Sequence, residues 1–498
     1  MGHKVTVKRI DWDGLAEELE GIEKPQASNQ KSRKFGIIVS AFIVVLLIGT
    51  SLGIMISATT PSIPTVIEPG SMMSGYSYVI SKDGTTFYAK NGTTGAIDFS
   101  NADAWTVITD AVAGSPGGAV FLKDGTYLLS QVLDLSHKRI SLFGESALNT
   151  VLQRAGDVLV INYTQGPVGF ARWSGLTLGN IRIDGVSTTG IGVNLTYGNS
   201  ETISGINIIN CNVGMRLRGV IGCTITDVIV VDCTTGMLWE ETEAGWENND
   251  NRMYGGYLGD CEFAIVLSNG TKGNTFYSVC FEQSLTRDLV SRSYAAVPAP
   301  QRTQFIGCYF ESTDAHHTAV SFESFAGGRT PGEATFQDCI FQSIQFPINI
   351  TGNHNTVSGC DFVYGGWPPG GYINITGENN TFINNMGWTY PDGGESLIWV
   401  KDNGKNNTFI GNNFYTTKQN GVAYIVASTA VTFTHGLGYA RYYAFAGADA
   451  NLTPTIVLAS FNNTLYGAWT WTATGTQVTI TVQNSGDYIV YWSAEMKN

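Results

Sequence analysis

The sequence predicts an all-β protein: a parallel β-helix of about ten or more coils, with an N-terminal transmembrane helix and a C-terminal β-sandwich. Three observations support this fold class. Glycine is frequent (59 of 498 residues) and charged residues are sparse (14%), as in turn-rich β proteins. One long apolar segment lies near the N-terminus. A repeat with fixed columns and loops of variable length occupies the middle of the chain.

The apolar segment 35–58 contains 24 residues with no charge and no proline. As a helix it would be about 36 Å long, enough to cross a bilayer. Lys31, Arg33 and Lys34 come just before it, and the next basic residue is Lys82. The positive-inside rule therefore places residues 1–34 in the cytoplasm or inside an envelope, and the rest of the chain outside the cell or virion. A cleaved signal peptide is the alternative, disfavoured because the apolar run is long and no short charged region precedes it.

The segments on either side of the predicted span are short. In the tail, Leu15, Leu19 and Ile22 fall on one helical face. This face could dock on an inner partner, but a disordered tail that carries only the topogenic charge is equally open. Residues 59–75 are rich in Pro, Gly and Ser and should form an extended linker.

Asn-x-Ser/Thr sequons occur only after the apolar segment, which agrees with export of that side. We expect some of them to carry glycans. The ten acceptors are Asn91, Asn162, Asn194, Asn269, Asn349, Asn374, Asn379, Asn406, Asn451 and Asn462.

The repeat has three columns: an apolar residue, a small or amide residue three positions later, and usually another apolar residue two further on. No helical period runs through it, which excludes stacked α-hairpins and favours a parallel β-helix. Gly, Asn or Asp often precedes the second column and marks a tight turn. The first column reads Ile181, Ile208, Val230, Leu258, Phe276, Phe305, Phe336, Val357, Phe382 and Phe409. The second reads Asp184, Cys211, Cys233, Cys261, Val279, Cys308, Cys339, Cys360, Asn385 and Asn412.

These coils and the segment 84–146 before them resemble the pectate-lyase-like right-handed β-helix superfamily. In that family a short helix, Ala104 to Ala113 in this sequence, closes the N-terminal end of the rod. The resemblance covers residues 76–425 and implies right-handed coils. It does not fix a function, because the same scaffold carries lyases, hydrolases, epimerases and adhesins. Spikes of this type are commonly homotrimers, so the resemblance also allows a homotrimer.

Residues 426–498 break the repeat and alternate apolar and polar residues in short runs. This pattern predicts antiparallel strands. The segment resembles the small β-sandwich modules that end viral fibre and surface proteins.

Six of the eight cysteines fall in the second column. They could form a ladder of buried thiols, the favoured interpretation, or disulfides between neighbouring coils, which export would permit. Zinc-site spacings are absent, so no metal site and no cofactor are predicted. Ca²⁺ could bind Glu240, Glu241 and Glu243, although a solvated loop is the simpler explanation.

Two glutamates are the predicted catalytic candidates. Glu282 and Glu311 each follow the third column, which would place them on adjacent coils, pointing outward. Such a pair suits acid–base or nucleophilic work on a glycosidic bond; the alternative is that both are merely solvated. The short motifs of pectin-degrading enzymes are absent, so the sequence leans away from an enzyme.

Aromatic residues in the loops suggest a second kind of site, because exposed rings stack on sugars. The candidates for carbohydrate binding are Trp239, Trp246, Trp367 and Trp388; core packing is the alternative for each. A net charge of −13 argues against a nucleic-acid partner, and none is predicted.

The function predicted first is that of a membrane-anchored extracellular glycoprotein, a spike or adhesin that binds glycans for surface or host attachment. An archaeal or other prokaryotic cell surface, or the envelope of a virus of such a cell, would suit it. A membrane-tethered polysaccharide lyase or glycoside hydrolase is the second hypothesis. A structural surface-layer or turret component is the third.

Overall fold

The computed structural model describes most of the chain after residue 74. The tail 1–34, the predicted transmembrane helix 35–58 and nearly all of the linker 59–75 lie outside the described residues. Within the described ranges, no helix is both long and apolar enough to cross a membrane. The described residues are 75–154, 159–166, 175–186, 189–242, 245–294, 299–311, 318–324, 330–342, 346–364, 371–389, 398–412, 415–416, 418–434, 438–439, 456–461, 469–473 and 477–495.

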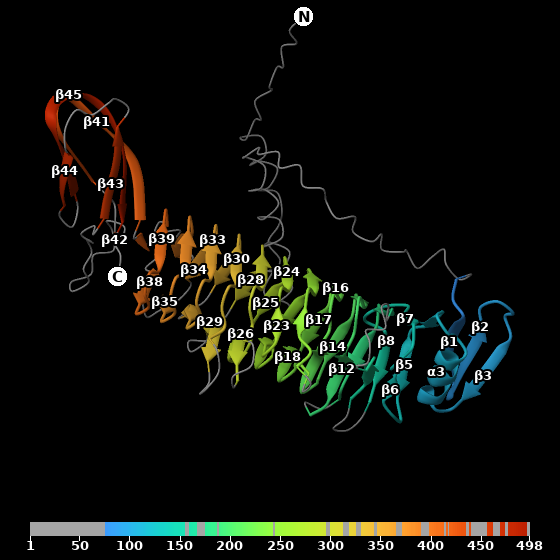
Figure 1. Ribbon diagram of the computed structural model, residues 1–498. Helices are drawn as coiled ribbons and strands as arrows, with labels where there is room; N and C mark the ends of the chain where they lie inside the picture. Colours follow the sequence, from blue (N-terminus) through green and yellow to red (C-terminus); the bar gives the residue numbers. More distant parts are fainter. Residues whose placement is uncertain are drawn as a thin grey trace, which may run out of the picture. The chain divides into compact units, whose positions relative to one another are not determined.

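The fold begins with an N-terminal cap. Three antiparallel strands, β1 (Tyr78–Asp83), β2 (Thr86–Asn91) and β3 (Ile97–Asn101), precede helix α3 (Ala104–Ala113). Asp103 caps the helix, because its carboxylate accepts hydrogen bonds from two backbone N–H groups of the first turn. The helix buries one apolar face against the first strands of the rod, at the blue end in Figure 1. The predicted closing helix is therefore confirmed.

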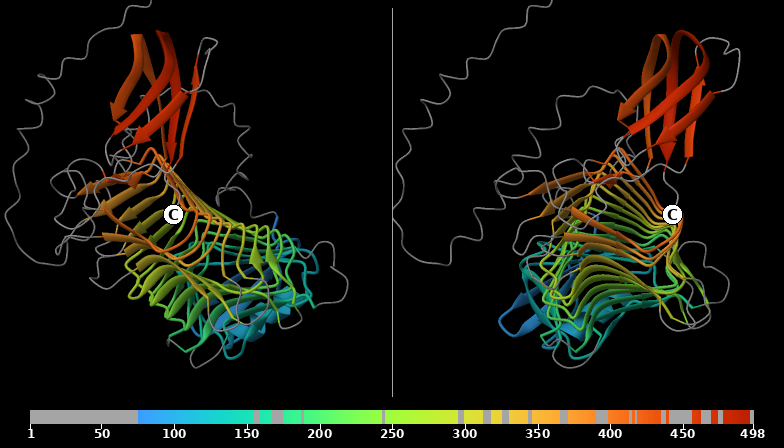
Figure 2. Two further views of the ribbon diagram at one scale, coloured as in Figure 1. Left: turned by 60° about the vertical axis from the view of Figure 1, so that its left-hand side comes forward. Right: turned by 90° about the vertical axis from the view of Figure 1, so that its left-hand side faces the viewer.

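The rod is a stack of coils, each made of one strand from sheet A, one from sheet B and one from sheet C, as Figure 2 shows from other sides. Neighbouring strands of each sheet are parallel, and sheets B and C each have 11 strands within the described residues. Sheet A consists of β4 (Ala119–Leu122), β7 (Ile140–Gly144), β10 (Leu176–Gly179), β13 (Thr202–Ser204), β16 (Thr224–Thr226), β20 (Arg252–Tyr254), β24 (Thr275–Tyr277), β27 (Gln304–Ile306), β30 (Thr335–Gln337), β33 (Thr356–Ser358), β36 (Thr381–Ile383) and β39 (Thr408–Ile410). Sheet B consists of β5 (Gly125–Leu128), β8 (Thr150–Gln153), β11 (Arg182–Asp184), β14 (Asn207–Ile209), β17 (Ile229–Val231), β21 (Tyr257–Gly259), β25 (Cys280–Glu282), β28 (Tyr309–Glu311), β31 (Ile340–Gln342), β34 (Asp361–Tyr364) and β37 (Met386–Thr389). Sheet C consists of β6 (Leu133–Asp134), β9 (Ile161–Thr164), β12 (Ile191–Thr196), β15 (Val213–Arg218), β18 (Thr235–Glu240), β22 (Phe263–Leu267), β26 (Arg287–Ser293), β29 (Thr318–Ser324), β32 (Phe346–Ile350), β35 (Gly371–Ile375) and β38 (Ile398–Asp402).

The core of the rod is built from ladders of identical side chains. On sheet A, Phe276 stacks on Phe305 with ring centroids 4.9 Å apart. On sheet B, Phe281 stacks on Phe310 at 4.8 Å. These spacings match the distance between neighbouring strands, so the backbone register itself holds the rings in contact. Each such contact adds roughly 0.5–1.5 kcal/mol beyond the area it buries.

The predicted first column joins residues that belong to two different sheets. Ile208, Val230 and Leu258 pair along sheet B and continue into Phe281. The predicted first column instead joined them to Phe276, which belongs to sheet A. The first column therefore mixes two sheets. The physical reason is that both kinds of strand end alike, with an apolar residue, one spacer, a left-handed residue and then a small side chain.

The cysteines accordingly form two ladders rather than one column. Three lie in the turns between sheets B and C (Cys211, Cys233 and Cys261), and three lie in the turns between sheets A and B (Cys308, Cys339 and Cys360). All eight cysteines are free thiols. The second ladder continues as a pair of amides, with Asn385 Nδ2 donating to Asn412 Oδ1 at 2.9 Å, as predicted.

The C-terminal strands are antiparallel, as the alternating pattern predicts. The long strands β41 (Lys418–Thr434) and β45 (Gln477–Glu495) pair with each other, and β45 also pairs with β43 (Ile456–Phe461) and β44 (Trp469–Ala473). Whether they form a sandwich stays a prediction. Short pairs complete the set: β19 (Asn248–Asn249) with β23 (Thr271–Lys272), and β40 (Tyr415–Thr416) with β42 (Gly438–Tyr439).

Candidate functional site

Glu282 and Glu311 lie where the sequence placed them. They are register partners on the adjacent strands β25 and β28. In both strands the middle residue, Phe281 or Phe310, is fully buried, so the flanking glutamates lie on the outer face of sheet B. Parallel neighbours hold their backbones about 4.8 Å apart. The catalytic role stays a prediction.

A hydrogen-bond network surrounds the two carboxylates. The Tyr309 hydroxyl donates to Glu311 Oε2 at 2.9 Å and also lies 3.0 Å from Gln342 Oε1. Gln342 Nε2 donates to Glu311 Oε1 at 3.1 Å. On the neighbouring strand, the Cys280 thiol donates to Glu282 Oε1 at 2.8 Å. Both oxygens of Glu311 are therefore held by neutral partners, which fixes its orientation.

We call this group the sheet-B patch: Tyr257, Cys280, Glu282, Tyr309, Glu311 and Gln342. Tyr309 was missed by the sequence reasoning, and Gln342, which continues the column of the two glutamates, was not proposed as a site residue. The period-2 rule could have found Tyr309, which stands two residues before Glu311 on the same face. The column itself could have found Gln342, which is level with Glu311 on the next coil.

The electrostatics of the patch differ from those of other acids on the rod. Burial raises the pKa of Glu282, and the carboxylates of Glu311 and Asp260 raise it further. Burial together with the glutamates also raises the pKa of Tyr309. Two acids on the outer face of sheet C pair with arginine instead: Glu240 with Arg216, and Glu323 with Arg287. Neither glutamate of the patch has a basic partner among the described residues.

The patch offers oriented acceptors, a phenol and one carboxyl group inclined to keep its proton. Such a set can bind hydroxyl groups or transfer a proton. In the described ranges, no three His, Cys, Asp or Glu side chains are arranged to hold a metal ion. In the proposed Ca²⁺ loop, Glu240 is engaged by Arg216 and Arg218, and Glu243 lies outside the described residues.

The predicted tryptophan platforms do not come together. Trp239 is fully buried and packs on Phe276 with ring centroids 4.9 Å apart, so its prediction as an exposed sugar platform is wrong. It belongs to the core because it lies on an inward position of β18. Trp246 is half-buried in the loop between β18 and β19. Trp388 lies in β37, level with Val363, and Trp367 lies outside the described residues.

The sequon asparagines fall into distinct settings, and their glycosylation stays a prediction. Asn379 and Asn406 are exposed in turns. Four others form amide pairs on the outer face of sheet C, with Asn194 donating to Asn162 and Asn374 donating to Asn349, each at 2.9 Å. Asn91 and Asn269 lie half-buried near the ends of their strands, Asn349 and Asn374 lie in β32 and β35, and Asn451 and Asn462 lie outside the described residues.

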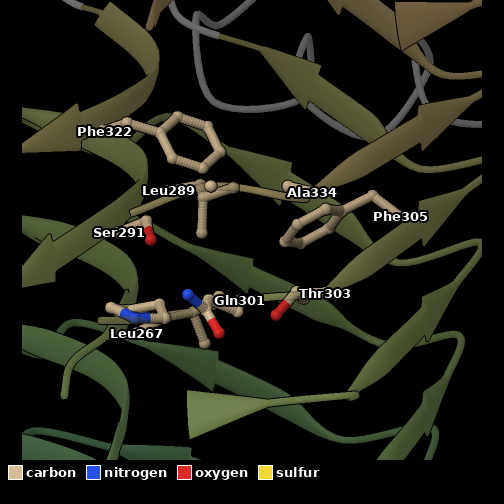
Figure 3. Close-up of a pocket in the computed structure, with 10 residues that line it drawn as sticks. Leu267, Leu289, Ser291, Gln301, Thr303, Phe305, Phe322 and Ala334 are labelled. Carbon is tan, nitrogen blue, oxygen red and sulfur yellow. The ribbon is translucent and has the colours of Figure 1, made fainter. Parts of the chain in front are cut away.

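A small cavity lies inside the rod, between sheets C and A (Figure 3). Its lining is mostly apolar, with Leu267, Leu289, Phe305 and Phe322 around it. These residues belong to the core. A sugar-sized ligand needs a larger cavity than this one, so the outer face of sheet B remains the candidate.

Comparisons with known proteins agree with this architecture. A family model described as "Right handed beta helix region" matches residues 297–437. The chain is a right-handed parallel β-helix. The β-helix is similar to DFA-IIIase from Arthrobacter chlorophenolicus A6 without its lid, at 12% identity and a TM-score of 0.50, covering 62% of this chain and 90% of that one.

Two further solved structures share the β-helix more loosely. The Dettilon tailspike protein is 10% identical with a TM-score of 0.45, over 79% of this chain and 91% of that one. The A-module of the Azotobacter vinelandii mannuronan C-5 epimerase AlgE4 is 12% identical with a TM-score of 0.45, over 60% and 93%. No curated relative matches the sequence.

Proposed function

We propose that this chain is a membrane-anchored surface spike that binds glycans through the sheet-B patch. One observation carries the proposal: Glu282 and Glu311 lie side by side on a rigid sheet and are held by neutral groups instead of cations. A carboxylate without a basic partner is a strong acceptor for other donors. Sugar hydroxyls are donors of this kind.

The neighbouring groups of the patch support the same ligand class. Tyr257 and Tyr309 are half-buried on the outer face and offer apolar rings with polar ends. Gln342 can donate and accept. Because Glu282, Glu311 and Gln342 lie level on three successive strands, an extended glycan could pass from one of these coils to the next and meet a polar group on each.

The anchoring part of the proposal rests on the sequence. The apolar segment 35–58, with three basic residues before it, fits a single-pass anchor whose bulk faces outward. Attachment to a host or to a neighbouring surface would then follow from glycan binding by the exported rod.

A polysaccharide array tests the proposal. The full chain in detergent micelles is applied to microbial and host polysaccharides, and both retention and cleavage are measured. We expect Glu311→Gln to weaken retention roughly 10- to 100-fold, because a hydrogen bond to a charged group contributes about 1.5–3 kcal/mol. Glu262→Gln, an exposed glutamate outside the patch, is the matched control and should bind as the wild type does. Equal retention by all three proteins would contradict the assignment of the patch.

A glycoside hydrolase is the second candidate, favoured by the unequal surroundings of the two glutamates. Burial raises the pKa of Glu282, as a proton donor requires, whereas Glu311 is oriented by two hydrogen bonds. Their backbone spacing of about 4.8 Å is compatible with the carboxyl separation of about 5–5.5 Å in retaining glycosidases. Released oligosaccharide that disappears in Glu282→Gln would establish this activity, and retention without cleavage would reject it.

A further inference from the structure

The coil that carries Glu282 has an acid in its interior. Asp288 lies on β26 between the register pairs Phe263–Arg287 and Ile265–Leu289, so it is level with Ala264 on the preceding coil. By the same register it is level with Ala319 on the following coil. All three residues are fully buried. A position that takes a methyl group on both neighbouring coils therefore takes a carboxyl group on this one.

A second polar replacement accompanies it. In the turns between sheets B and C, a cysteine follows the left-handed residue on three coils, as Cys261 follows Asp260. On the coil of Glu282 the left-handed residue is Gln283, and Ser284 stands in the cysteine position, almost fully buried. This turn is also longer: four residues (283–286) separate β25 from β26, whereas three (260–262) separate β21 from β22.

The two replacements act together. Burial raises the pKa of Asp288 well above its usual range, hydrogen bonding from Ser284 opposes part of this rise, and the carboxylates of Glu282 and Glu311 add to it. The titratable groups that act electrostatically on Asp288 include Glu282 on β25 and Glu311 on β28, and the Cys280 thiol is in turn affected by Asp288. On the neighbouring strands β22 and β29, Ala264 and Ala319 lie at its level. Three carboxyl groups within electrostatic range do not all ionise at low cost, and the wholly buried one keeps its proton.

We infer that Asp288 is a proton-holding positioning residue that acts with Ser284 to hold the turn 283–286 next to Glu282, and so orients the sheet-B patch. With Asp288 neutral, the turn stays closed and Glu282 keeps its place beside Glu311. With Asp288 ionised, a buried negative charge repels both glutamates and strains the turn. Glycan binding should therefore weaken as the pH rises through the range in which Asp288 ionises. The binding part of this inference rests on the proposed function.

The sign of the stability effect follows from linkage. A carboxyl group whose pKa is raised in the folded state contributes stability that is complete below its unfolded pKa, about 3.9. That stability is lost as the pH rises toward the folded pKa. Asn has the shape of Asp but does not titrate. The stability of Asp288→Asn relative to the wild type should therefore increase as the pH rises.

Thermal unfolding of the full chain, measured as a function of pH, tests whether Asp288 is protonated in the folded state and needs no ligand. We expect Asp288→Asn to unfold several degrees above the wild type at about pH 8 and at the same temperature near pH 4. Asp338→Asn, an exposed acid in a left-handed turn, should follow the wild type throughout. A constant offset between Asp288→Asn and the wild type at every pH would overturn the inference. If Asp288→Asn fails to fold, Asp288→Ala, which copies the neighbouring coils, takes its place.

Glycan retention against pH forms the second arm. The wild type should lose retention as the pH rises, and Asp288→Asn should keep it. Identical profiles for the two proteins would reject control of the patch by Asp288. It is also possible to separate the two proposals. If neither protein retains a glycan at any pH but the pH-dependent stability difference is present, the proposed function is rejected, and the conclusion that Asp288 is protonated in the folded protein is retained.

Discussion

Single residues of the turns show how the coil dictates part of the sequence. Asn379 has a left-handed backbone (φ 58°) and is exposed, and Asn380 is buried. Thr381 then opens strand β36. These three residues form a sequon, yet the fold itself accounts for both asparagines. An amide side chain tolerates the left-handed turn at Asn379, and a buried amide at Asn380 can bridge neighbouring coils. The sequons at Asn379 and Asn406 therefore need no glycan to explain them.

Two substitutions in one sequon separate the fold from the glycan. Asn380 Oδ1 accepts from the backbone N–H of Asn355, and Asn380 Nδ2 donates to the carbonyl of Gly352. Asn380→Ala keeps the sequon but leaves these buried groups unpaired, at a cost of about 1–3 kcal/mol each. We expect its thermal midpoint to fall by several degrees in calorimetry. Asn379→Gly, the control, removes the sequon at a position that suits glycine and should unfold close to the wild type.

At the scale of elements, the turn ladders are the repeating device of the rod. The hydrogen bond with the Cys211 thiol raises the pKa of Cys233 to about 12. Burial raises the pKa of Cys280, the one half-buried cysteine. A thiol is reactive only as the thiolate. Both ladders should therefore be chemically inert while the coils are intact.

Thiol labelling with an alkylating reagent checks this expectation. The folded chain should label slowly, with Cys280 first, and all eight cysteines should label after denaturation without prior reduction. Mass spectrometry under non-reducing conditions counts the labels. Fewer than eight labels in the denatured chain would mean that the exported protein forms disulfides, contrary to the ladder of free thiols.

Much of each coil could be predicted from the sequence, but not the sheet to which each strand belongs. The buried apolar columns, the left-handed turn residues and the adjacency of Glu282 and Glu311 all follow from local patterns. The assignment of Val230 to sheet B could not, because its strand and turn resemble those around Phe305 on sheet A. Trp239 was misplaced for a related reason: inward and outward positions alternate, and the alternation is visible only once the strand boundaries are known.

At the scale of the whole molecule, the predicted topology gives a direct test. Protease added outside intact cells or sealed vesicles should digest the exported region and spare residues 1–34. Replacing Lys31, Arg33 and Lys34 by Glu should reduce the fraction of correctly oriented chains, because these basic residues set the orientation. Immunoblotting with a tag at each end measures both. Digestion of the N-terminal tag in intact vesicles would reject the anchor as described.

The nearest-neighbour pairing of the strands has a consequence for how such a rod changes over generations. The strands of each coil form backbone hydrogen bonds only with the coil before it and the coil after it. The segments 377–385 and 404–412 have nearly identical sequences. Duplicating or deleting one whole coil would leave every remaining ladder intact and alter the length by about 4.8 Å. The length of the rod can therefore change in steps of one coil without disturbing the remaining coils.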